Sequence, residues 1–157
     1  MNLLKRKIRL FSPVNGESIS ISEVKDEVFA NKLIGDGIAF KLYEDMIYSP
    51  CTGEITAIAS TKHAIGIRGK NGIEILLHVG MDTVSLEGEG FEVLTEVEAK
   101  VEPGDPLIKF DEAFLKSKEM DTLTMIVVTN PGDFQPEQFL TNKEVKAAND
   151  PIMVYKK

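Results

Sequence analysis

The chain has 157 residues, and its 18 lysines and arginines against 25 aspartates and glutamates give a net charge of −7. This length is typical of one domain with its own core, and the charge argues against binding to nucleic acid. The single cysteine, Cys51, excludes a disulfide within the chain, and no apolar run is long enough for a transmembrane helix. We therefore expect a cytoplasmic protein.

The first residues are basic. Four lysines and arginines lie within the first nine positions, and no long apolar stretch or cleavage site follows them, so they do not form a secretory signal. Without these four residues and the last two lysines, 12 basic residues face 25 acidic ones, which suits basic partner proteins or simply keeps the protein in solution. We assign residues 1–10 to a flexible basic tail, which would bind anionic lipid only marginally, and residues 11–157 to a single domain.

An internal repeat opens the domain. The hexapeptide SPVNGE at residues 12–17 recurs 37 residues later as SPCTGE at residues 49–54, and an isoleucine-rich stretch follows each copy. Proline pre-sets a turn and glycine permits the positive φ that closes it, whereas the alternating stretch is typical of a half-buried strand. The repeat predicts one β-motif used twice within a domain.

Short strands are predicted along most of the remaining sequence. They cover residues 37–42, 64–68, 73–77, 91–94, 107–110 and 125–128. Asn71-Gly72 between two of them predicts a hairpin with a primed turn. Only residues 22–29 and 111–119 predict helices, both short. We therefore expect an all-β fold, namely an antiparallel, barrel-like β-sandwich with a duplicated β-motif and one or two short helices.

The two histidines form the candidate site, because the sequence contains no P-loop and no G-x-S-x-G nucleophile elbow. His78 ends an apolar run, and His63 enters another predicted strand. If these strands pair around Asn71-Gly72, residue 78 faces residue 65 and residue 63 faces residue 80, so both imidazoles can approach on one face. Two unrelated core or surface histidines are the alternative.

Two adjacent imidazoles can carry out phosphoryl chemistry. A neutral imidazole nitrogen is a nucleophile near pH 7 and can accept a phosphoryl group. A second imidazole and a hydroxyl such as that of Thr61 can then donate hydrogen bonds to the charged oxygens. Asp36 and Asp82 can bind arginines of a partner protein, or they can serve only as turn residues.

These residues resemble the glucose-family IIA component (EIIA, type 1) of the bacterial phosphoenolpyruvate:sugar phosphotransferase system. The longest matching string is HxGxDTVxLxGxGF, from His78 to Phe91. Further matches run over most of the chain and lie at residues 12–17, 23–30, 35–39, 49–53, 61–64 and 127–130. The resemblance implies an antiparallel β-sandwich, which agrees with the strand pattern.

The resemblance also implies roles for individual residues. His78 would accept a phosphoryl group on Nε2 from the phosphocarrier HPr and pass it to a sugar-specific IIB domain, so the chain would be a phosphotransferase component in sugar uptake. His63 would stabilise the phosphoryl group, and Thr61 would orient His63. The backbone carbonyl of Gly80 would hold Nδ1 of His78.

The expected partners are HPr and the IIB and IIC parts of a membrane permease. Asp36 and Asp82 would contact arginines of these partners, and the chain itself would be a monomer. The apolar collar around the histidines would consist of Ile38, Phe40, Leu76 and Val84.

Three other expectations concern function and cofactors. No cofactor is required, although His63 and His78 would suit a zinc ion shared with a carboxylate of a partner protein. The same face would also suit a regulatory module that only binds target proteins. A zinc-dependent peptidase is the weakest hypothesis, because it needs a third protein ligand that two histidines cannot supply.

Overall fold

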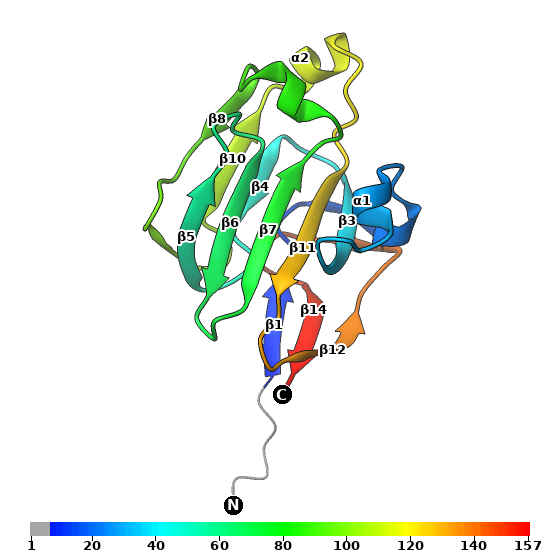
Figure 1. Cartoon of the computed structure of the whole chain (residues 1–157). Coiled ribbons are helices and arrows are strands. Elements are labelled where there is room, and N and C mark those ends of the chain that lie inside the picture. Colours follow the sequence, from blue (N-terminus) through cyan, green and yellow to red (C-terminus); the bar gives the residue numbers. More distant parts are fainter. Residues whose placement is uncertain (1–6) are drawn as a thin grey trace, which may run out of the picture.

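The computed structural model describes residues 7–157, which form three antiparallel β-sheets and few helices (Figure 1). The helical elements are η1 (Ile21–Glu23), α1 (Glu27–Ala30), η2 (Thr83–Leu86) and α2 (Glu112–Ser117). None of these helices has the length and apolar character that a membrane span requires. The expected antiparallel β-sandwich is confirmed.

The largest sheet has eight strands in the order β13-β2-β3-β11-β7-β6-β5-β9. In chain order they are β2 (Gly16–Ser20), β3 (Asp36–Leu42), β5 (Gly53–Ile58), β6 (Ala64–Gly69), β7 (Glu74–Val79), β9 (Lys100–Val101), β11 (Thr124–Asn130) and β13 (Lys143–Val145). One small sheet contains β1 (Lys7–Phe11), β14 (Pro151–Lys156) and β12 (Gln135–Phe139). The other contains β4 (Met46–Tyr48), β10 (Pro106–Phe110) and β8 (Phe91–Val93).

The two faces of the large sheet bury different sets of side chains, since successive residues of a strand point to opposite faces. One face supplies the main core, to which Ile38, Leu77 and Ile126 contribute fully buried side chains. The other face carries a smaller cluster that η1 and α1 cover. It consists of Ile21, Val24, Phe29, Ala39, Met125 and Val127, with Ile19, Leu76, Met81 and Leu123 at its margin.

Both copies of the repeated hexapeptide form the same turn. The hydroxyl of Ser12 donates to the carbonyl of Val14 at 2.6 Å, and the hydroxyl of Ser49 donates to that of Cys51 at 2.8 Å. Both serines are fully buried. Buried hydroxyls need such partners, so the repeated serine serves the same structural purpose twice.

The two copies also bind each other reciprocally. The amide of Phe11 donates to the carbonyl of Pro50 at 2.8 Å, and the amide of Tyr48 donates to that of Pro13 at 2.7 Å. Each donor precedes its own serine and each acceptor follows the other serine. The duplicated motif is therefore a pair of turns related by an approximate twofold axis.

A second pair of turns extends this symmetry, and the sequence pattern did not reveal it. The carboxylate of Asp105 accepts from the amide of Glu102 at 2.8 Å, and that of Asp150 accepts from the amide of Lys146 at 2.7 Å. The backbone carbonyls of these two aspartates accept from the amides of the two repeated serines, both at 2.8 Å.

The expected tail boundary at residue 10 needs a correction. Residues 7–10 belong to β1, which pairs with β14 from Lys7 opposite Lys156. Ile8 and Leu10 are buried, while Lys7 and Arg9, which alternate with them, are exposed. Part of the charge that suggested a tail therefore belongs to the exposed side of a strand. The rest of the assigned tail, residues 1–6, lies outside the described residues.

Candidate functional site

The β6–β7 hairpin brings the two histidines together. His78 of β7 lies opposite Ala64, the first residue of β6, so His63 is one position before the strand. The loop has three residues, 70–72, closed by the amide of Gly69 on the carbonyl of Ile73 at 2.8 Å. Residue 78 was expected to face a residue near 65, and this is confirmed to within one position. The offset of one arises because Gly72 at φ +89° ends a longer loop than a primed turn.

The rings of His63 and His78 are in contact. Their centroids lie 4.8 Å apart with the planes at 86°, and the centroid of the Phe29 ring from α1 lies 4.9 Å from that of His78. His63 is buried and His78 is half-buried. The expected histidine pair thus exists, and Phe29 is a member of the site that the sequence pattern missed.

Strand register explains the apolar surroundings of His78. Met125 of β11 lies opposite His78, and Ala39 of β3 lies opposite Met125. Directly opposed residues of antiparallel strands share a face, so His78 belongs to the face of the smaller cluster. Water reaches this imidazole only from the open side.

Thr61 contacts His63 as expected. Its Oγ1 lies 2.8 Å from Nδ1 of His63, in a tight turn where Lys62 has a φ of +63°. Burial lowers the pKa of His63, and the backbone of Thr61 acts weakly in the opposite direction. When the threonine hydroxyl donates to Nδ1, the proton of His63 resides on Nε2, where it can serve a ligand.

His78 is held neutral at pH 7. Burial, reinforced by the nearby His63, lowers its pKa to about 4, while the backbone of Gly80 and the carboxylate of Asp26 act in the opposite direction. Within residues 7–157, Nδ1 of His78 is the one buried side-chain nitrogen or oxygen without a full hydrogen bond. Gly80 supplies the backbone group that acts on the pKa of this ring.

Two carboxylates flank the hollow beside the loop that follows His78. Asp82 is exposed before η2, and Asp26 caps α1 by accepting from the amide of Val28 at 2.8 Å. With Met81 and Asp121 they line a hollow of about 390 Å³. Asp82 is where the sequence placed it, whereas Asp26 was not considered.

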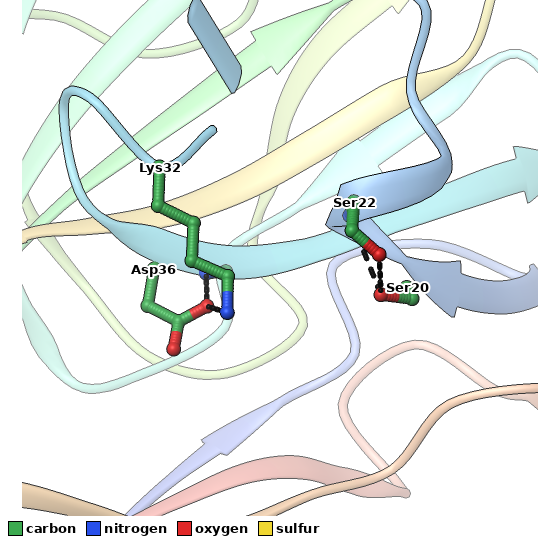
Figure 2. A network of polar contacts seen from close by, with 5 residues as sticks. Ser20, Ser22, Lys32 and Asp36 are labelled. Carbon is green, nitrogen blue, oxygen red and sulfur yellow. Dashed lines mark hydrogen bonds and ion pairs between the residues drawn. The ribbon is translucent and has the colours of Figure 1, made fainter. Parts of the chain in front are cut away.

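Asp36 lies elsewhere. It heads β3 opposite Val128, which in turn lies opposite Ile75, three positions along the sheet from His78, or about 10 Å. Its Oδ1 contacts Nζ of Lys32 at 3.4 Å and accepts from the amide of Gly37 at 2.9 Å (Figure 2). The structure therefore does not bring Asp36 to the histidines, because its carboxylate closes the turn into β3.

Of the four residues expected to form the apolar collar around the histidines, two lie on the other face of the sheet. Ile38 and Phe40 are fully buried in the main core, on the face opposite to the histidines. Leu76 lies on the histidine face, and Val84 is 55% exposed on η2. The alternation along β3 suggested that one face was apolar, but only the register with β11 decides which face His78 shares.

An exposed apolar segment follows Asp26 in place of the missing collar residues. Val28, Leu33 and Ile34 expose 43%, 70% and 36% of their surface. Large apolar side chains exposed next to a buried reactive group are typical of a protein-binding surface. The signal available in the sequence was the apolar residues of 28–34 in an otherwise acidic region, next to Asp26.

Metal binding has little support from the part of the chain that the structure describes. No group of three or more His, Cys, Asp or Glu side chains in residues 7–157 is arranged to hold a metal ion. His63 and His78 would supply two ligands at most, and Cys51 is buried with its pKa raised to about 12 by burial. The thiol is therefore neither a ligand nor a nucleophile.

Comparisons with known proteins show the family to which the chain belongs. Residues 8–134 match the family described as phosphoenolpyruvate-dependent sugar phosphotransferase system, EIIA 1. The structure superposes on the glucose permease IIA from Mycoplasma capricolum with a TM-score of 0.90 and 35% identity, over 98% of this chain and 99% of that one.

Sequence relatives have two sizes. A glucose-specific EIIA component from Bacillus cereus is 47% identical over 121 residues, which cover 77% of this chain and 73% of that protein. A glucoside-specific EIICBA component from Staphylococcus carnosus is 42% identical over 134 residues, which cover 85% of this chain but only 19% of that protein. The chain thus spans about a fifth of the larger relative.

Proposed function

We propose that His78 carries the phosphoryl group in this chain, which belongs to the EIIA 1 family of the phosphoenolpyruvate-dependent sugar phosphotransferase system and acts as a phosphoryl carrier in sugar uptake. The observation that supports this role best is the imidazole pair, with His78 kept neutral and open on one side. A neutral ring with a free Nε2 lone pair is the form that attacks phosphorus.

The transfer step is a displacement at phosphorus. Nε2 of His78 donates its lone pair to the phosphorus of a phosphohistidine on HPr, a new N–P bond forms, and the N–P bond of the donor breaks. The electron pair of the broken bond returns to the donor imidazole. Transfer to a cysteine thiolate of a IIB domain repeats this step with His78 as the leaving group. The proton on Nδ1 of His78 stays in place during both steps.

His63 stabilises the phosphoryl oxygens in this mechanism. Its ring lies edge-on to His78, at 4.8 Å between centroids, and Thr61 fixes its orientation through Nδ1. A proton on Nε2 of His63 then points toward the charge that gathers on the oxygens during transfer. Loss of His63 would remove this donor while leaving the nucleophile intact.

The surface around His78 suits HPr and a IIB domain as partners. Exposed apolar side chains, Val28 and Val84, follow closely in sequence after Asp26 and Asp82, whose carboxylates line one hollow. Such a combination fits a partner with apolar side chains and arginines around its own reactive group. Relatives in which this segment is part of an EIICBA component support a permease for glucose or a glucoside as the destination.

Regulatory targets would use this same face, but no observation favours them over phosphoryl transfer. A zinc ion shared with a partner lacks support in the described residues. A peptidase is disfavoured on the same ground, since it would need a third ligand in this chain.

Labelling with phosphoenolpyruvate, the first enzyme of the system and HPr tests the proposal. The wild type should gain one acid-labile phosphoryl group, and His78→Gln should gain none. His63→Gln should be labelled but should pass little phosphate to a IIB domain. Asp36→Asn, far from the histidines, serves as the control and should behave as the wild type. Labelling that persists in His78→Gln would refute the assignment.

A further inference from the structure

We infer that Thr83 is a positioning residue for phosphoryl transfer, because its hydroxyl and its methyl group together fix the loop that faces Nδ1 of His78. This inference rests on the proposed role of His78 as the phosphoryl acceptor. The loop runs from Val79, next to His78, through Gly80 to Thr83 at the start of η2. None of the reacting atoms touches Thr83, so its influence is indirect.

The hydroxyl closes the loop. Oγ1 of Thr83 donates to the backbone carbonyl of Val79 at 2.6 Å, and Thr83 is fully buried. This bond spans four positions and leaves Thr83 at the beginning of η2, directly after Asp82 in a left-handed conformation. A buried carbonyl without a partner is unfavourable, so the folded loop depends on this hydroxyl.

The methyl group packs against Gly80. Gly80 has a φ of +79°, and a Cβ atom there would overlap Cγ2 of Thr83. The segment before β11 also contacts Gly80, because its amide donates to the carbonyl of Leu123 at 3.0 Å. The next amide, that of Met81, donates to the carbonyl of Asp121 at 2.9 Å. The Gly80 peptide is therefore held by Thr83 and by this segment together.

This arrangement decides the protonation of His78. Nδ1 is buried and has no hydrogen-bond partner within the described residues, while the backbone of Gly80 raises the pKa of this ring, so a fixed Gly80 carbonyl is the acceptor that can hold a proton there. A proton on Nδ1 leaves Nε2 unprotonated, which is the tautomer that attacks phosphorus. A loose loop would allow both tautomers and would reduce the fraction of reactive rings.

A set of three variants separates the two parts of Thr83. Thr83→Val keeps the methyl packing and removes the hydroxyl, Thr83→Ser keeps the hydroxyl, and Thr83→Ala removes both. Ser12→Ala is the matched control, because Ser12 is also fully buried and also donates to a backbone carbonyl, at 2.6 Å, but lies in the repeated turn before β2. Thermal unfolding shows how stable each variant is.

Two measurements on folded protein at pH 7.5 test the inference. The ¹⁵N chemical shifts of the His78 ring report its tautomer, and rapid mixing with phospho-HPr gives the labelling rate. We expect a mixture of tautomers and a loss of labelling rate of about tenfold or more in Thr83→Val and Thr83→Ala. We expect Thr83→Ser and Ser12→Ala to keep the Nδ1–H tautomer and a rate within about threefold of the wild type.

The outcomes are distinct. If Thr83→Val or, should that variant not fold, Thr83→Ala keeps one tautomer and the wild-type rate, the inference is wrong and Thr83 is only structural. An unchanged tautomer in a destabilised variant would likewise mean that Thr83 is only structural. If the wild type itself accepts no phosphate, the proposed function fails, while the tautomer measurement still reports on the loop.

Discussion

The environment of His78 explains why a phosphoryl group would be both accepted and released. An imidazole in contact with the rings of Phe29 and His63 loses part of its contact with water, and a charged form is therefore unfavourable. A phosphoryl group attached to Nε2 brings two negative charges to the same place. The N–H of His63 compensates for them only in part, so the adduct keeps a strong tendency to transfer its phosphoryl group to the next acceptor.

The same burial predicts that the protein is less stable in acid. An unfolded His78 binds a proton below about pH 6.5, whereas the folded one does so only near its pKa of about 4. The unfolded state therefore holds more protons in this window, and the free energy of unfolding falls as the pH falls. From this residue we expect a loss of about 3 kcal/mol between pH 6.5 and 4.

Urea unfolding at several pH values between 4 and 7.5 measures this effect. Carboxylates also titrate in this window, so the wild type must be compared with His78→Gln, whose side chain binds no proton. The variant should lose clearly less stability on acidification. Parallel curves for the two proteins would contradict the proposed burial of a neutral imidazole.

At the scale of elements, the short helix α1 connects the buried site with the surface. Phe29 points inward onto His78 and is 6% exposed, while its neighbour Val28 is 43% exposed. Asp26 caps the helix, and its charge is close enough to raise the pKa of His78. One four-residue helix thus supplies a ring contact, an apolar docking residue and a carboxylate.

A matched pair of variants tests which aspartate guides the partner. Asparagine caps helices as well as aspartate, so Asp26→Asn removes the charge and keeps α1. We expect its labelling rate at low phospho-HPr concentration to fall about three- to tenfold, with a weaker dependence on salt. Asp36→Asn should leave both quantities unchanged, because that carboxylate closes a distant turn.

Initial rates at several HPr and salt concentrations decide between the two residues. A larger effect at Asp36 than at Asp26 would show that the docking surface has been placed on the wrong side of β3.

Sequence patterns predicted the strands and the histidine pair but not the selection of docking residues. Asp36 precedes a predicted strand, whereas Asp26 lies inside the predicted helix 22–29 and caps a helix that begins only at Glu27. Their positions depend on how α1 folds over the face of β3 and β11, which is a matter of tertiary packing. The assignment of Ile38 and Phe40 failed for a related reason, since a face can be matched to His78 only once the register of three strands is known.

At the scale of the whole molecule, the duplication organises the sandwich. The hexapeptide repeat was visible because serine, proline and glycine recur at fixed offsets. The second pair of turns, at residues 102–105 and 146–150, differs in length by one residue and shares few residue types, so its equivalence became apparent only from the hydrogen bonds. The two turns therefore share their backbone hydrogen bonds although their sequences differ.

The reciprocal bonds predict energetic coupling between the two repeated serines. Ser12→Ala and Ser49→Ala each leave a buried carbonyl without its donor, and each should lower the free energy of unfolding by about 1–3 kcal/mol. Since the two turns bind each other, the double variant should deviate from the sum by about 0.5 kcal/mol or more. Urea unfolding of the four proteins gives this coupling. Strict additivity would mean that the turns fold as independent units.

The pairing of β1 with β14 determines where a linker to a fused domain would leave this chain. Lys7 lies opposite Lys156, so both ends of the described chain come together at the bottom of the view in Figure 1, while β7 leads upward to His78. A linker attached to either end would leave from the same point and keep the histidine face free. In a fused protein, the local concentration of this carrier near its acceptor would thus depend on linker length alone, not on which end is joined.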